Sequence, residues 1–152
     1  MAETLGSLCD KLTIVKLKQW HATDANAQTS LADQETRLRE EIDAYVRDAA
    51  GGVIPPGRLT FAANKVYRKE GNAVADVRGG IGAIMGQLAD VNCRLWHVQE
   101  TVYAFEQVPP EEKNGVVKQL ALLNLERTRC IDQIDLELQK LLEPRAGNGA
   151  SG

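Results

Sequence analysis

Polar and charged residues stand on the apolar faces of several expected helices, and they are the candidates for chemistry. In the segment from 110 to 142, Asn124 and Arg127 occupy two steps of a stripe with apolar 3-4 spacing. An interior amide or guanidinium must be hydrogen-bonded or paired, because burying either without a partner is costly. We therefore expect other helices to supply partners. The polar residues that border apolar faces in this way are Asp10, His21, Asn92, Glu100, Asn124, Arg127 and Asp135.

Two interpretations of this polar set remain open. A helical bundle can gather such groups into one layer, where a buried network would define the register of the helices. Alternatively, the layer is a small interhelical pocket for an anionic ligand. In that pocket Arg127 would be the two-pronged donor, while Asn92 and Asn124 would orient the ligand. In either case we expect Asn124 and Arg127 to face inward, toward Asn92 and Glu100.

Other kinds of site have less support. A basic, glycine-flanked loop that includes Arg58, Lys65 and Arg68 is a weak candidate for holding an anion, and a solvated connector is the simpler interpretation. Metal sites in bundles use Glu-x-x-His, whereas this chain has the reverse order, His97-x-x-Glu100, and 2 histidines in all. We expect no metal and no cofactor. No Ser-His-Asp or Cys-His arrangement is legible, and whether the chain is an enzyme stays open.

The cysteines and the composition narrow the class of protein. Cys9, Cys93 and Cys130 lie among apolar residues without a C-x-x-C pair, which predicts buried, reduced thiols. The net charge of −3 argues against nucleic-acid binding. No apolar run approaches the roughly 20 residues that span a bilayer. The first residues lack a basic-then-apolar signal, so we expect a cytoplasmic protein.

The elements that position these residues are predicted to be helices. Their expected ranges are 3–22, 31–49, 82–107 and 110–142. Pro109 and Pro110 break the chain, so the last two helices should pack antiparallel. The third helix carries an unbroken 3-4 seam of Ile81, Ile84, Leu88, Val91, Leu95, Val98, Val102 and Phe105. The stripe of the fourth helix is Val117, Leu120, Ile131, Ile134, Leu138 and Leu141.

These elements predict an all-α protein: an antiparallel four-helix bundle with an irregular, glycine- and proline-rich insertion between its second and third helices. With 152 residues we expect one helical domain, 1–144, and a disordered tail, 145–152. The apolar faces of the first and third helices are wide for a bundle of this size. A protein partner or a homo-oligomer is therefore expected, with an anionic small molecule as the other possible partner.

Three motifs together resemble a known family. They are Asp10-x-Leu12-x-Ile14-x-x-Leu17-Lys18-x-x-His21, Asn92-x-x-Leu95-Trp96-x-x-x-Glu100 and Asn124-x-x-Arg127-x-x-x-Ile131-Asp132-x-Ile134-Asp135. This pattern is similar to a bacterial, all-helical domain-of-unknown-function family that is often associated with surface-polysaccharide or lipopolysaccharide glycosyltransferase genes. The resemblance implies a cytoplasmic location and an accessory role in glycan assembly. It implies no established reaction.

Overall fold

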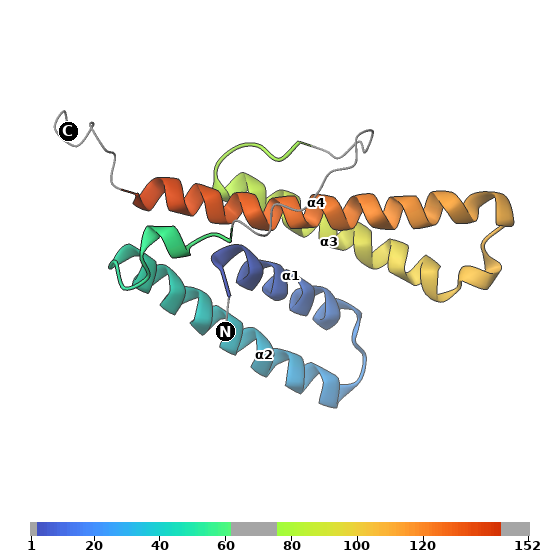
Figure 1. Ribbon diagram of the computed structural model, residues 1–152. Coiled ribbons are helices and arrows are strands. Elements are labelled where there is room, and N and C mark those ends of the chain that lie inside the picture. Colours follow the sequence, from blue (N-terminus) through green and yellow to red (C-terminus); the bar gives the residue numbers. More distant parts are fainter. Residues whose placement is uncertain (1–2, 62–75, 144–152) are drawn as a thin grey trace.

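The computed structural model describes residues 3–61 and 76–143. Within these residues the chain is all-α, as predicted, and contains no strand. Its long helices are α1 (Leu5–His21), α2 (Ala25–Ala50), α3 (Ile81–Tyr103) and α4 (Pro110–Leu142) (Figure 1). Two short 3-10 turns accompany them, η1 (Pro56–Arg58) and η3 (Phe105–Gln107). The predicted disordered tail lies outside the described residues.

The ends of the helices follow from local capping. The side chain of Thr4 accepts the backbone N–H of Ser7, and the hydroxyl of Ser7 accepts the N–H of Thr4, which closes a capping box at the start of α1. Asp24 caps α2 by accepting the N–H of Ala27. The predicted start of this helix at residue 31 is therefore wrong by about two turns, because Asp24 is the better N-cap.

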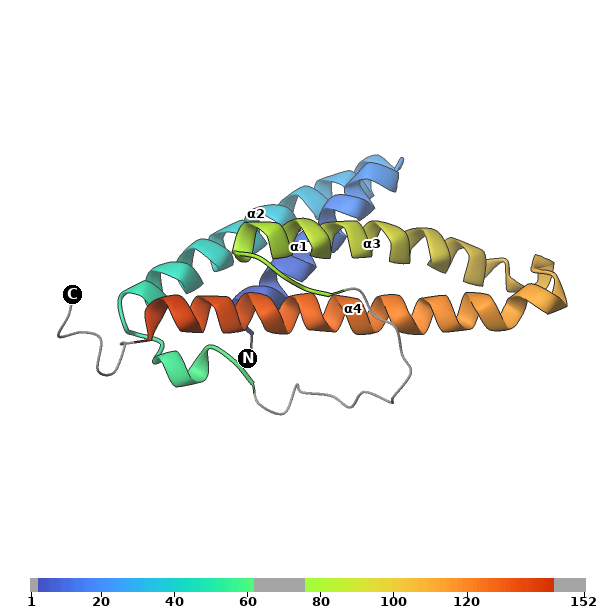
Figure 2. The ribbon, with the colours of Figure 1, turned by 90° about the horizontal axis from the view of Figure 1, so that it is seen from above.

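The helices form two antiparallel hairpins. The longer hairpin consists of α3 and α4 joined through η3, and the shorter one consists of α1 and α2 (Figure 1). Of the shorter hairpin, α1 lies innermost and packs against both α3 and α4. The two hairpins cross at an angle, and the η3 end of the longer hairpin extends past α1 and α2 in both views (Figures 1 and 2). Among the described helices, none lies over that end.

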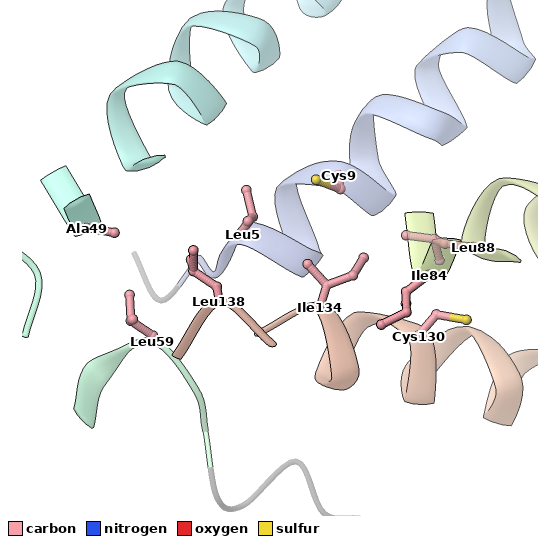
Figure 3. Close-up of a cluster of buried hydrophobic side chains, with 9 residues drawn as sticks. All are labelled: Leu5, Cys9, Ala49, Leu59, Ile84, Leu88, Cys130, Ile134 and Leu138. Carbon is pink, nitrogen blue, oxygen red and sulfur yellow. The ribbon is translucent and has the colours of Figure 1, made fainter. Parts of the chain in front are cut away.

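The main hydrophobic core lies where the hairpins cross. All the long helices contribute to it, and Leu59, which follows η1, is completely buried in it. Part of the expected irregular insertion therefore packs as core. The cluster consists of Leu5, Cys9, Ala49, Leu59, Ile84, Leu88, Cys130, Ile134 and Leu138 (Figure 3). A second cluster lies between α3 and α4 alone and consists of Val91, Leu95, Val98 and Leu123.

The predicted stripes differ in how well they match the core. On α3 the middle of the seam, from Ile84 to Val98, is buried as expected. On α4, Val117 and Leu141 are exposed, so their assignment to the core stripe is wrong. Val117 lies in the part of the hairpin that extends past α1, and Leu141 lies in the last turn of α4. In the part of the chain that the structure describes, no neighbouring helix covers either position.

A glycine allows α1 to approach α4 closely. A Cβ added at Gly6 would lie 2.3 Å from the carbonyl oxygen of Ile131. That separation is far below van der Waals contact, so only glycine permits this helix crossing. The crossing brings the first turn of α1 against the backbone of α4 and places the polar side chains of both helices within reach of each other.

Candidate functional site

A buried carboxylate on α1 joins the two hairpins. Asp10 accepts hydrogen bonds from both sides of the longer hairpin. Arg127 on α4 donates from Nε to Oδ1 over 2.8 Å and from Nη2 to Oδ2 over 2.5 Å. Asn92 on α3 donates from Nδ2 to Oδ1 over 2.9 Å. The side chain of Asp10 is 6% exposed and that of Arg127 is 35% exposed. The pair is thus a two-pronged ion pair with one buried and one half-buried end.

This arrangement neutralises the charge of Arg127 within the protein. The hydrogen bond to Asp10 raises the pKa of the guanidinium, while partial burial works in the opposite direction. Two of the guanidinium N–H donors are occupied by the carboxylate. The Oδ1 atom of Asn92 is buried and has no hydrogen-bond partner among the described residues. The layer therefore locks three helices together, with one acceptor left unsatisfied.

A second buried carboxylate lies at the start of α1. Asp135 on α4 accepts the backbone N–H of Gly6 over 2.7 Å, which satisfies one of the free N–H groups in the first turn of α1. Burial raises the pKa of Asp135 to about 6, although the bonds from Gly6 and from the hydroxyl of Thr4 act to lower it and the charge of Asp132 acts to raise it. Burial is thus the larger influence on this carboxyl.

The C-terminal end of α1 is joined to α3 by an aromatic contact. The ring of His21 stacks on the indole of Trp96, with ring centroids 4.6 Å apart and planes within 9°. Along α1, therefore, Gly6 contacts α4, Asp10 contacts both α3 and α4, and His21 contacts α3. The helix crosses the hairpin obliquely, as Figure 2 shows.

This oblique path explains which predicted residues do not belong to the layer. Asn124 is exposed, and its Nδ2 donates to the carbonyl of Leu120 on its own helix. Glu100 is also exposed. The prediction that these two side chains face inward is wrong, because α1 has moved from α4 to α3 before it reaches the level of Asn124. Glu100 lies one turn beyond Trp96, past the end of α1.

Of the predicted set, the structure brings together Asp10, Asn92 and Arg127. Asp135 and His21 lie at the two ends of α1, each with a separate partner. Arg127 was expected to face inward toward Asn92 and Glu100. It does face inward, but its acidic partner is Asp10 and not Glu100. Sequence reasoning also missed Glu126, a buried carboxylate that accepts from Nε2 of Gln87 over 3.1 Å. The sequence could have indicated that Glu126 is buried, because it stands between Leu123 and Cys130 at the 3-4 spacing of a helix face.

The remaining predicted residues are placed as follows. Lys65 and Arg68 of the basic loop lie outside the described residues, and Arg58 is exposed in η1. Cys9 and Cys130 are buried, and burial raises the pKa of each thiol to about 11. Cys93 is exposed, so its predicted burial is wrong. The apolar residues around it point to the other side of α3.

The fold and this polar layer define an all-α protein whose hairpins are joined through buried charge. In the described ranges, no three His, Cys, Asp or Glu side chains come close enough together to hold a metal ion. Over the same ranges, no helix is both long enough and apolar enough to cross a membrane. Comparison of the chain with protein-family models, with curated proteins and with solved structures gave no match.

Proposed function

We propose that this chain is a non-enzymatic helical module that acts through protein contact, in the first place with a second copy of itself. The observation that carries this proposal is a pair of large aromatic side chains left in water. Trp20 in the last turn of α1 is 85% exposed, and Tyr103 at the end of α3 is 86% exposed. Side chains of these two types are enriched at the centres of protein interfaces.

The position of these side chains supports a contact at one end of the molecule. The C-terminal end of α1 and the C-terminal end of α3 point the same way (Figure 1). Tyr103 lies two turns beyond Trp96 on the same face of α3, the face on which His21 stacks. Val117 is also exposed, and it lies in the first half of α4, the part that packs beside the C-terminal half of α3. Helices from a partner would cover the part of the hairpin that α1 and α2 leave bare.

The polar layer favours this proposal over a pocket for an anionic ligand around Arg127. An incoming anion would have to displace Asp10, a carboxylate that is buried and already bonded to Arg127 through both of its oxygens. Displacement would leave the charge of Asp10 without a partner in the interior, which is strongly unfavourable. The layer accordingly serves to hold α1 on the hairpin, so that the surface beyond α1 is presented rigidly.

The cellular setting belongs to the same proposal. The resemblance of the motifs around Asp10, Asn92 and Arg127 to the bacterial family described above supports an accessory role in surface-glycan assembly in the cytoplasm. In that role the module would hold proteins together and would not itself transform a substrate.

The test is the mass of the protein in solution. We expect light scattering coupled to size exclusion to give a dimer whose fraction rises with concentration. The double variant Trp20→Gln/Tyr103→Gln should weaken dimerisation by at least about 30-fold, which corresponds to the loss of one interface hot spot of about 2 kcal/mol. Val53→Gln is the control, because Val53 is also an apolar residue that is mostly exposed (73%), and it follows the C-terminal end of α2, away from Trp20. A strictly monomeric protein, or a dimer that the double variant leaves intact, would overturn the proposal.

A further inference from the structure

A cavity opens on the side of the molecule away from the polar layer. It has a volume of about 760 Å³ and lies between the start of α1, the second half of α2 and the segment around η1. Cavities that hold small molecules are usually between about 300 and 1,000 Å³. The cavity shares no lining residue with the Asp10 layer or with the exposed aromatic pair described above.

The charged groups of this cavity are mostly acidic. Glu41 and Asp48 stand two turns apart on the same face of α2 and both line the cavity. Neither carboxylate makes a side-chain hydrogen bond or ion pair with another described residue. Glu3 also lines the cavity, but it is bonded to Nζ of Lys11 over 2.6 Å. Among the described residues, Arg58 is the single cation in the lining. Within the described part of the chain, the cavity therefore carries two carboxylates without a side-chain partner, Glu41 and Asp48, and one guanidinium.

The remaining wall is apolar and aromatic. Tyr45 lies on α2 between the two carboxylates, and Leu8 and Ile54 complete the deeper part of the wall. Phe61 and Val53 line the cavity while remaining exposed to solvent. The hydroxyl of Tyr45 is buried without a hydrogen-bond partner among the described residues. Aromatic faces attract cations, so this wall suits a positively charged group with an apolar body.

We propose that this cavity binds a small organic cation, an ammonium group carried on an aromatic or branched apolar body. Glu41 and Asp48 accept hydrogen bonds from the ammonium group, and charge-assisted bonds of this kind are the stronger ones. Phe61 and Val53 cover the apolar body and lose their exposure to water. An anion is disfavoured, because it would approach two carboxylates to reach Arg58.

The experiment uses three probes that share one apolar body. Phenethylammonium carries a positive charge, 2-phenylethanol carries none, and phenylacetate carries a negative charge. Each is titrated into the full chain and followed by heteronuclear NMR. We expect saturable binding of phenethylammonium with shifts in residues that line the cavity, weaker binding of the alcohol and no binding of the acid.

A pair of matched variants separates this site from general attraction to an acidic protein. Glu41→Gln/Asp48→Asn removes both carboxylates from the cavity and should raise the dissociation constant for phenethylammonium at least about tenfold. Glu40→Gln/Asp43→Asn makes the same change of charge on α2 at residues that do not line the cavity, and it should leave binding unchanged. Circular dichroism shows that each variant is folded.

Three results would overturn the proposal. They are no saturable binding of phenethylammonium at any concentration up to its solubility, equal binding of phenylacetate, and equal weakening by the two pairs of substitutions. Dimerisation is measured separately, so the proposed protein-contact function and this cavity can fail independently of each other.

Discussion

Removal of Arg127 should destabilise the protein far more than its position on a partly exposed helix face suggests. In Arg127→Met, the carboxylate of Asp10 stays in a site where its side chain is 6% exposed. Of its donors among residues 3–61 and 76–143, only Asn92 remains. Breaking a fully buried ion pair costs about 3–5 kcal/mol. Because Arg127 is itself 35% exposed and water can approach from that side, we expect a loss of about 2–4 kcal/mol.

Replacing the other member of the pair, Asp10, should cost less stability. In Asp10→Asn the unpaired guanidinium lies at the half-exposed end, where it can hydrate, so the expected loss is about 1–2 kcal/mol. In the double variant neither charge of this pair remains. The two single losses should therefore exceed the loss in the double variant by about 1–2 kcal/mol, which is the coupling energy of the pair.

Urea denaturation followed by circular dichroism at pH 7 measures these quantities. Lys16→Met is the control, since Lys16 and Glu35 also join two helices by an ion pair, but Lys16 is mostly exposed and its loss should cost less than about 1 kcal/mol. If Arg127→Met costs no more than Lys16→Met, or if the two single losses simply add, Asp10 and Arg127 do not form the buried connection that the fold needs.

Further predictions concern the close approach of α1 to α4, the titration of Asp135 and the reactivity of the cysteines. Gly6→Ala should destabilise by about 3 kcal/mol through overlap with the carbonyl of Ile131, whereas Gly86→Ala, with open space around it, should stabilise by up to about 1 kcal/mol in the same urea assay. Asp135 has a pKa raised from 3.8 to about 6, so its contribution to stability is complete below pH 4 and is lost as the pH rises through 6. Relative to Asp135→Asn, the wild type should lose up to about 3 kcal/mol between pH 4 and pH 7; parallel pH profiles of the two proteins would contradict this. Cys93 should react with a thiol reagent in the native protein, while the two buried cysteines should react only after unfolding; three equal rates would be the contrary result.

The fold was predictable because its signals are local. The 3-4 spacing on α3 predicts a buried seam without knowledge of its neighbours, and Pro109-Pro110 marks the start of α4. The start of α2 was predicted too late because Ser30, which directly precedes the predicted start at residue 31, is as good an N-cap residue by type as Asp24. The choice between the two depends on how α2 packs on α1. That packing is tertiary information, which spacing does not contain.

The site was only partly predictable for a related reason. Spacing can say that Arg127 and Asn124 share an edge of α4, but it cannot say how far α1 covers that edge. The oblique crossing of α1 decides it, and Gly6 is the residue that permits the crossing. With α1 moving toward α3, Arg127 finds Asp10 while Asn124, one turn away, is left in water.

The partners of α1 also set the order in which a nascent chain can fold. Asp10 is separated from Arg127 by 117 positions in the sequence, and Gly6 is separated from Asp135 by 129. On the ribosome, α1 and α2 can pair as soon as they emerge, but the surface of α1 that packs on the longer hairpin stays open until α4 has also been synthesised. Contacts so distant along the chain slow the final folding step. Translation must therefore pass residue 135 before the chain can close, and until then the apolar face of α1 is open to chaperones.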